Sequence, residues 1–247
     1  MTILGIIGGT GLRQLEGLTV TQRAPVETPY GPTSGSLIYG SFHDRQVIFL
    51  ARHGDPHNID PHRINYRANI WALGQAGVRK ILATSAVGGI HPDLTDGRLA
   101  IPDQIIDYTW GRGHSFFEDD PNETVHIDFT EPYCPALRAL LLRAARAGKI
   151  AVRDGGTYGA MQGPRLETAA EINRLERDGC DMVGMTGMPE AALARELDIC
   201  YASCALVVNP AAGRGDGPIR MEDILRVLET GMGAFRNLVR HVLLLME

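Results

Sequence analysis

Four uninterrupted apolar runs, each followed at once by glycine or polar residues, constrain the fold of this chain more than any other feature of its sequence. Strands that helices cover on both faces have such continuous runs, whereas strands with one solvated face alternate between apolar and polar residues. Stretches with a helical spacing of apolar residues separate the runs, and this alternation is typical of an α/β fold with a mixed central sheet flanked by helices. The predicted strands are residues 2–7, 47–51, 80–84 and 201–208, and the predicted helices are residues 65–76, 135–147, 167–177, 189–197 and 221–246.

Glycine and proline mark the expected ends of these helices. Gly77, Gly148 and Gly179 follow three of the helical stretches, at the place where glycine commonly ends a helix. Pro189 stands where proline fits as the first residue of a helix. The final stretch has two glycines in its interior, and we expect it to form two helices that are broken near residues 231–233.

The length and charge of the chain limit its class. Its 247 residues fit one α/β domain, residues 1–247, and the 44% hydrophobic and 21% charged residues are typical of a globular protein. The net charge of −5 disfavours nucleic acid as a partner, because duplex binding needs a basic field. No apolar run is long enough to span a membrane, and no basic segment precedes the first apolar residues, so we expect a cytoplasmic protein without a membrane partner.

The cysteines and histidines give no sign of a metal site. His53 and His57 have the spacing of two ligands on one helix, but Gly54 and Pro56 between them disfavour a helix. The cysteines have no zinc-binding spacing, and we predict reduced, mostly buried thiols. These cysteines are Cys134, Cys180, Cys200 and Cys204.

Residues suited to binding an oxyanion follow three of the predicted strands. In open α/β sheets, ligands bind beyond the carboxyl ends of the strands. The glycine-rich turn at 8–11 exposes backbone N–H groups, and Arg52 offers a forked cation beside His53. Ser85 and the N–H of Ala86 would add neutral donors. Each of these features has a purely structural explanation when taken alone, but their joint occurrence favours a phosphate site.

A set of longer motifs spans nearly the whole chain. They are Gly-Gly-Thr-Gly-Leu at 8–12, Leu-Ala-Arg-His-Gly at 50–54, Asn-Tyr-Arg-Ala-Asn-Ile-Trp-Ala-Leu at 65–73, Gly-Pro-Arg at 163–165, Gly-Met-Thr-Gly-Met-Pro-Glu at 184–190, and His126 followed by Glu-Pro-Tyr-Cys-Pro at 131–135. In this order, from residue 3 to about residue 228, they resemble the methylthioadenosine phosphorylases. The resemblance implies the purine nucleoside phosphorylase fold.

The resemblance also implies a reaction in which phosphate displaces a purine base from C1′ of a nucleoside. Inorganic phosphate is a co-substrate, and no cofactor or metal is needed. The transition state resembles an oxocarbenium ion, which the phosphate dianion stabilises electrostatically. By similarity, phosphate would be held by Thr10, Arg52, His53, Ser85, Ala86 and Thr186.

The same resemblance implies contacts for the sugar and for a second subunit. Met185 would contact the ribose hydroxyls. Members of this type are usually homotrimers, and His126 would reach a neighbouring subunit's site near the 5′ substituent.

Two positions depart from the adenine-specific members of the family. Those enzymes have serine where this chain has Glu167, and an Asp-x-Asp sequence where this chain has residues 209–211, Asn-Pro-Ala. The 6-oxopurine nucleoside phosphorylases have glutamate and asparagine at these two places. An ionised Glu167 accepts the N1–H of hypoxanthine but repels the N1 lone pair of adenine, and a buried mismatch costs about 1–3 kcal/mol. Asn209 can accept from N7–H and donate to O6.

These departures predict a site for a 6-oxopurine. The alternatives are an acid in the first turn of a helix for Glu167 and a turn residue before proline for Asn209. We expect catalysis to depend on Asn209, Glu167 and His53. The base would contact Leu166, Glu167, Asn209, Pro210 and Ala211.

The 5′ end of the nucleoside is a second point of choice. Met221, Ile224 and Leu225 fit one helix face and would form an apolar wall for a methylthio group, although some of this stripe can be core. A one-residue gap leaves Glu222 as the alternative to Met221. An apolar 5′ pocket and an oxopurine site together predict 5′-methylthioinosine as the substrate. A general inosine/guanosine phosphorylase, a methylthioadenosine phosphorylase, a hydrolase and a non-catalytic nucleotide-binding protein remain as alternatives.

Overall fold

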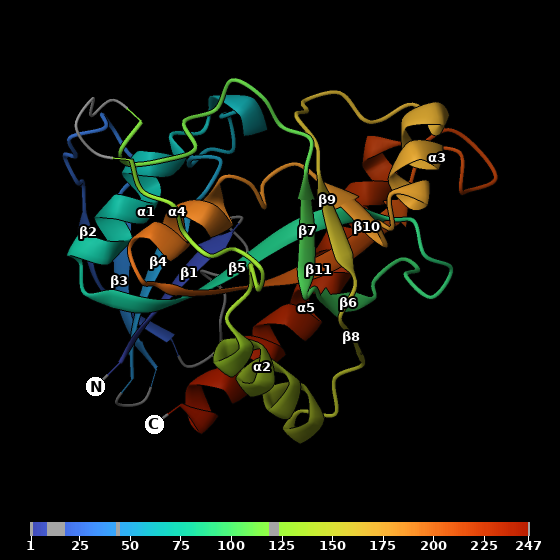
Figure 1. The fold of residues 1–247 in the computed structure, drawn as a ribbon. Coiled ribbons are helices and arrows are strands. Elements are labelled where there is room, and N and C mark those ends of the chain that lie inside the picture. The colour runs from blue at the N-terminus through green and yellow to red at the C-terminus, as the bar shows by residue number, and fades with distance from the viewer. Residues whose placement is uncertain (1, 9–17, 43–44, 119–123, 247) are drawn as a thin grey trace.

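The computed structural model describes residues 2–8, 18–42, 45–118 and 124–246, and its centre is a mixed sheet of eleven strands (Figure 1). The strands are β1 (Ile3–Gly8), β2 (Leu18–Ala24), β3 (Leu37–Phe42), β4 (Arg45–Ala51), β5 (Val78–Gly89), β6 (Leu99–Ile101), β7 (Gln104–Asp107), β8 (Val152–Asp154), β9 (Thr157–Ala160), β10 (Met182–Gly184) and β11 (Cys200–Pro210). The helices are α1 (Tyr66–Gln75), α2 (Pro135–Ala147), α3 (Ala169–Arg177), α4 (Glu190–Glu196) and α5 (Met221–Leu245), with a 3-10 turn at Pro61–Arg63.

Four parallel strands form the middle of the sheet, in the order β4-β1-β5-β11. Their carboxyl ends therefore share one edge. Antiparallel strands β3 and β2 extend the sheet beyond β4, while β10 joins β5 in antiparallel pairing and continues to β9 and β7. The predicted mixed α/β sheet is confirmed. However, β5 and β11 run further than predicted, so Ser85, Ala86 and Asn209 lie inside strands rather than after them.

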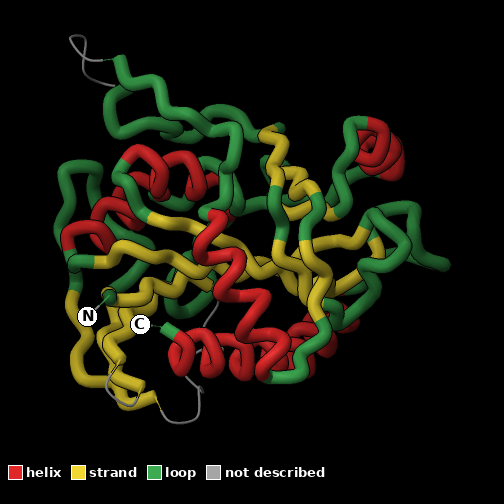
Figure 2. Tube along the Cα trace, turned by 60° about the horizontal axis from the view of Figure 1, so that its bottom comes forward, coloured by secondary structure: helices red, strands yellow, loops and turns green. Residues whose placement is uncertain are grey.

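Helices cover both faces of the sheet (Figure 2). Leucines of α2 and α5 pack with β1, β4 and β11 in one apolar cluster, and the apolar faces of α1 and α4 pack on the opposite side. Helix α3 lies at the far end of the sheet, where Ile172 and Leu175 form a smaller cluster with Val183 of β10 (Figure 1). The continuous apolar runs of the central strands follow from this double coverage.

The C-terminal stretch forms one helix of 25 residues, so the predicted break near residues 231–233 is wrong. Gly231 is buried, and a Cβ placed on it would lie 2.6 Å from the Leu206 side chain of β11. The glycine therefore lets α5 pack closely on the sheet, and the helix continues through it.

The ends of the other helices agree with the sequence in part. Helix α1 is followed by Gly77 with φ +85°, and α2 has the predicted bounds. Helix α3 begins at Ala169 rather than at 167, because Thr168 forms a capping box with Glu171. Pro189 is the residue before the first helical residue of α4, not the first helical residue itself.

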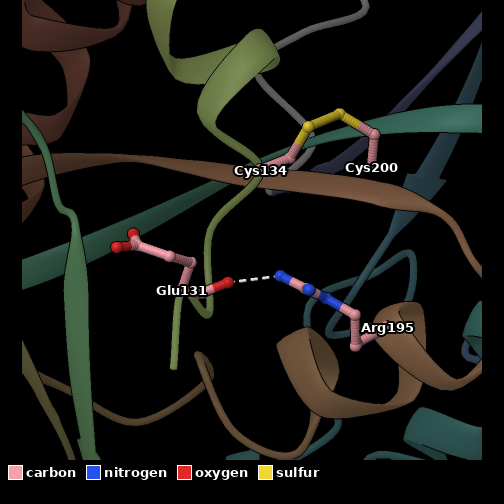
Figure 3. Close-up of a disulfide and its surroundings, with 4 residues drawn as sticks. All are labelled: Glu131, Cys134, Arg195 and Cys200. Carbon is pink, nitrogen blue, oxygen red and sulfur yellow. Dashed lines mark hydrogen bonds between the residues drawn. A yellow bond between two sulfur atoms is a disulfide. The ribbon is translucent and has the colours of Figure 1, made fainter. Parts of the chain in front are cut away.

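A disulfide joins the start of α2 to the start of β11 (Figure 3). Cys134 and Cys200 form it, with a Cα–Cα distance of 5.2 Å, so the prediction that they are free thiols is wrong. Cys180 and Cys204 are buried free thiols, as predicted. The cysteine spacings are compatible with free thiols or with a disulfide. The pairing depends on the hydrogen bond from Cys134 N–H to the Tyr201 carbonyl, which brings the two segments together and which only the fold creates.

Within the described ranges, no helix is long and apolar enough to cross a membrane.

Candidate active site

Arg52 lies at the buried end of the candidate site, directly after β4. Its N–H donates to the Gly8 carbonyl of β1, and the residue is 2% exposed. The guanidinium binds the Glu190 carboxylate through two hydrogen bonds, Nε to Oε2 at 2.8 Å and Nη2 to Oε1 at 2.7 Å. Nη1 donates to the Thr84 carbonyl at 2.7 Å. The fork expected to face phosphate is therefore directed at a carboxylate, and one N–H on each terminal nitrogen has no acceptor among the described residues.

His53, the next residue, is neutral at pH 7. Burial and the nearby Arg52 charge lower its pKa to about 4. Nδ1 lies 2.9 Å from the Ile59 carbonyl, and a carbonyl only accepts, so Nδ1 carries the hydrogen. The ring stacks on His57 with centroids 4.3 Å apart. Nε2 is consequently a hydrogen-bond acceptor, suited to a protonated phosphate oxygen or a hydroxyl.

The other predicted phosphate ligands adjoin this ion pair along the chain. Ser85 follows Thr84 in β5, and its hydroxyl is buried with no partner among the described atoms, while Ala86 is exposed. Thr186 is buried just after β10, with its N–H 3.3 Å from the Tyr158 hydroxyl. Thr10 lies outside the described residues.

Glu167 stands in the segment between β9 and α3, outside the helix. The acid that caps α3 is Glu171, which also pairs with Arg165, so helix capping does not explain Glu167. Burial raises the pKa of the Glu167 carboxyl. Within the described structure, no other residue donates a hydrogen bond to that carboxylate. Leu166 beside it is 40% exposed.

Asn209 lies in β11 where the pairing with β5 shifts register, opposite Gly88. Its Nδ2 donates to the Pro210 carbonyl at 2.6 Å, which leaves Oδ1 and one N–H of the amide for a ligand. Pro210 is exposed, whereas Ala211 is buried and its N–H binds the Gly89 carbonyl. This hydrogen bond holds Ala211 against the end of β5.

The segments that carry Glu167 and Asn209 are brought together by contacts that the sequence did not reveal. Gly213, with φ +76°, approaches the first residue of α3 so closely that a Cβ would lie 2.8 Å from that of Ala169. Arg214 binds Glu176 at 2.7 Å and Asn173 at 2.9 Å on the same helix. The loop after Asn209 is therefore fastened to α3.

Arg112 joins the base segment to the sugar segment and was also missed. It is 8% exposed, and its terminal nitrogens donate to the carbonyls of Gln162 and Met185, each at 2.9 Å. Gly163 in turn lies against the sulfur of Met185. An isolated arginine in an irregular stretch gives no signal for such a role, because only the fold brings its acceptors to it, which are backbone carbonyls and the Tyr66 hydroxyl.

At the predicted 5′ end, the apolar residues divide into two groups. Met221 and Leu225 are 62% and 59% exposed on the first turns of α5. Ile224 is 7% exposed and packs in the core beneath α5, so its place in the pocket stays a prediction. Glu222 is exposed as well, and His126 is exposed on the segment before α2.

A cavity of about 230 Å³ lies elsewhere, beside the disulfide, and is lined by Cys134, Cys200, Tyr201 and Arg195 among others. Arg195 donates to the Glu131 carbonyl at its rim (Figure 3). None of the predicted site residues lines this cavity. The described residues contain no cluster of three His, Cys, Asp or Glu side chains that could hold a metal ion.

The fold and the arrangement at the strand ends define a class of protein. The chain belongs to the phosphorylase superfamily, whose family model matches residues 3–244. It is 57% identical to a probable S-methyl-5′-thioinosine phosphorylase of Pseudomonas syringae pv. tomato, over 98% of this chain and 99% of that protein. It is 46% identical to a probable 6-oxopurine nucleoside phosphorylase of Thermococcus kodakarensis, over 92% of this chain and 86% of that protein. The crystal structure of a methylthioadenosine phosphorylase from an Antarctic soil metagenomic library has the same fold, with a TM-score of 0.93, 35% identity, and coverage of 98% of this chain and 85% of that one.

Proposed function

We propose that this enzyme uses phosphate to cleave S-methyl-5′-thioinosine, giving hypoxanthine and S-methyl-5-thio-α-D-ribose 1-phosphate. The single observation that carries the choice of base is Glu167. Its carboxylate is partly buried outside α3, and helix capping does not need it. Such a group is available to accept the N1–H of a 6-oxopurine.

Asn209 supports the same base. Its amide has a free acceptor oxygen for N7–H and a remaining N–H for O6. The contacts of Gly213 and Arg214 with α3 hold the two base-reading segments together. An adenine would place its N1 lone pair against Glu167, which costs about 1–3 kcal/mol for a buried pair. This favours oxopurines by roughly tenfold to a hundredfold.

The chemical step is a displacement at C1′. The C1′–N9 bond breaks with its electron pair going to the purine. N7 takes up one proton, balanced by the proton that hydrogen phosphate releases on becoming the sugar phosphate dianion, and Asn209 stabilises the leaving base by accepting the N7–H hydrogen bond. A phosphate oxygen forms the new bond to C1′ from the opposite face. Arg52, His53, Ser85, Ala86 and Thr186 would position that phosphate, and Met185 would position the ribose. Preorganised groups around developing charge supply most of the rate enhancement in such a site.

The choice of 5′ substituent rests on Met221 and Leu225. These exposed apolar side chains lie one turn apart on α5, and a methylthio group would be better matched to them than a hydroxyl would. The 57% identical relative is a probable S-methyl-5′-thioinosine phosphorylase, while the 46% identical relative is a probable 6-oxopurine nucleoside phosphorylase. A general 6-oxopurine nucleoside phosphorylase is therefore the second candidate, and a methylthioadenosine phosphorylase is the third.

A homotrimer completes the proposal. His126 is exposed on the segment that precedes α2, and in a trimer it would line the 5′ end of a neighbouring site. We propose inorganic phosphate as co-substrate, no cofactor, and a cytoplasmic location.

One substrate panel tests the function. Release of free base from methylthioinosine, inosine and methylthioadenosine is measured with and without phosphate. The proposal requires phosphate dependence, with kcat/KM highest for methylthioinosine. A higher kcat/KM for methylthioadenosine would overturn the base assignment. Equal kcat/KM values for methylthioinosine and inosine would overturn the 5′ assignment. Base release without phosphate would indicate a hydrolase.

A further inference from the structure

Among the described residues, Glu190 is the one fully buried carboxylate, and the proposed reaction does not yet use it. It is 0% exposed at the start of α4. Both carboxylate oxygens are bound to Arg52, and Oε1 also accepts from the Tyr201 hydroxyl at 2.9 Å. Tyr201 is itself held in place, because its carbonyl accepts from the Cys134 N–H and its ring stacks on Tyr133. The carboxylate is therefore rigidly fixed on one edge of the guanidinium.

This pairing determines the electrostatics of the proposed phosphate site. Arg52 is the only cation among the described residues assigned to phosphate, and Glu190 cancels its charge at hydrogen-bond distance. His53 is neutral at pH 7, and Ser85, Ala86 and Thr186 are neutral donors. The described part of the site therefore carries no net charge before phosphate enters.

A neutral site has a consequence for the reaction. The sugar becomes cationic in the transition state, and phosphate stabilises it only as far as its own negative charge is not already neutralised. An unpaired Arg52 would bind phosphate more tightly in the ground state and would repel the sugar cation. Tighter binding of the ground state without matching stabilisation of the transition state lowers KM and also lowers kcat.

We infer that Glu190 is a positioning residue for the reaction: it fixes the guanidinium of Arg52 and cancels its charge, so that bound phosphate keeps its negative charge for the sugar cation. This inference rests on the proposed function. It predicts that removal of the carboxylate charge lowers kcat without weakening phosphate binding. The variant loses hydrogen bonds that orient Arg52, but the Coulomb attraction between the uncancelled Arg52 charge and the phosphate dianion acts over a longer range and compensates for them.

The test compares Glu190→Gln, Glu190→Asp and Glu196→Gln with the wild-type enzyme. Glu196, at the other end of α4, binds only the Phe116 N–H among the described residues and serves as the matched control. With methylthioinosine and phosphate varied separately, we expect Glu190→Gln to lower kcat fivefold or more. Its phosphate KM should fall or stay unchanged, and its nucleoside KM should stay within twofold. Glu190→Asp keeps the charge and should recover most of kcat, and Glu196→Gln should change nothing beyond twofold.

A phosphate KM that rises more than twofold in Glu190→Gln, or a loss of kcat below fivefold, would overturn the inference. If that variant does not fold, Tyr201→Phe tests the positioning with the charge retained. We expect its phosphate KM to rise threefold or more with nucleoside KM within twofold, and any other pattern counts against Glu190. Wild-type enzyme that releases no base in phosphate would refute the proposed function instead, so the two failures are distinguishable.

Discussion

The two ends of the candidate site are built in different ways. At the phosphate end, Arg52, Glu190 and Thr186 are buried on or beside central strands, and the guanidinium is fully oriented by protein groups. At the base end, Glu167 stands on a connecting segment and Asn209 near the end of β11, and both are only partly buried; the Asn209 amide has hydrogen-bonding capacity left over. The difference suggests that the phosphate end is rigid before substrate arrives, whereas the base end is completed by the substrate it selects.

The largest expected effect of this difference is on protein stability, at the buried phosphate end. Arg52→Ala leaves the Glu190 carboxylate buried and unpaired, which should lower the free energy of unfolding by about 3–5 kcal/mol. Asn209→Ala removes a half-exposed amide, and its cost should stay within about 1 kcal/mol. Urea unfolding of both variants measures the difference. Equal, small losses would show that the phosphate end is not held by its ion pair.

The second effect concerns selectivity and belongs to the base end. Glu167→Ser combined with Asn209→Asp should move the ratio of kcat/KM for methylthioadenosine to that for methylthioinosine upward by roughly tenfold to a hundredfold. The physical reason is that the carboxylate facing N1 is removed while an acid is placed near N7 and the exocyclic group. Each single variant serves as a control. A double variant that gains no adenine activity would show that other residues read the base.

A smaller effect is expected at the 5′ end. Met221→Asn should reduce the preference for methylthioinosine over inosine by about tenfold, since one apolar contact in a pocket contributes about 1–3 kcal/mol. Glu222→Gln, on the neighbouring position, should leave the preference within about twofold. Kinetics with both nucleosides measure it. If Glu222→Gln changes the preference more than Met221→Asn does, the two positions were assigned the wrong way round.

The sequence predicted the buried parts of this molecule better than their connections. The four apolar runs identify the central strands because double coverage leaves no solvated face. The short strands β6 to β10 were missed, since three or four residues carry too little periodicity. The roles of Glu190 and Arg112 were missed for another reason: their partners, Arg52 and the carbonyls of Met185 and Gln162, are distant in sequence. Gly231 of α5 was misinterpreted because its close approach to Leu206 is a tertiary contact. Glu167, in contrast, was singled out because it departs from the serine of the methylthioadenosine phosphorylases that the chain resembles, and its role stays a prediction.

The last prediction uses pH to separate the two ends. Burial raises the pKa of Glu167 above its ordinary value of 4.5, so its carboxylate takes up a proton at a higher pH than a free carboxyl does. A protonated Glu167 cannot accept N1–H as the carboxylate does, so kcat/KM for methylthioinosine should fall as pH falls through that raised pKa. His53 has its pKa lowered to about 4 and stays neutral over the same range.

Glu167→Gln is the matched variant, because its amide oxygen still accepts N1–H and does not titrate in this range. Its kcat/KM should be lower than that of the wild-type enzyme at pH 7 and should fall less between pH 7 and pH 5, because protonation of the phosphate dianion affects both proteins alike. Protein stability must be followed at each pH, because the lowered pKa of His53 makes the folded state lose stability as pH falls from about 6.5 towards 4. An acidic decline that is the same in both proteins, with both still folded, would mean that the group titrating is at the phosphate end or on phosphate itself. The division between a preset phosphate end and a substrate-completed base end would then have no support from pH.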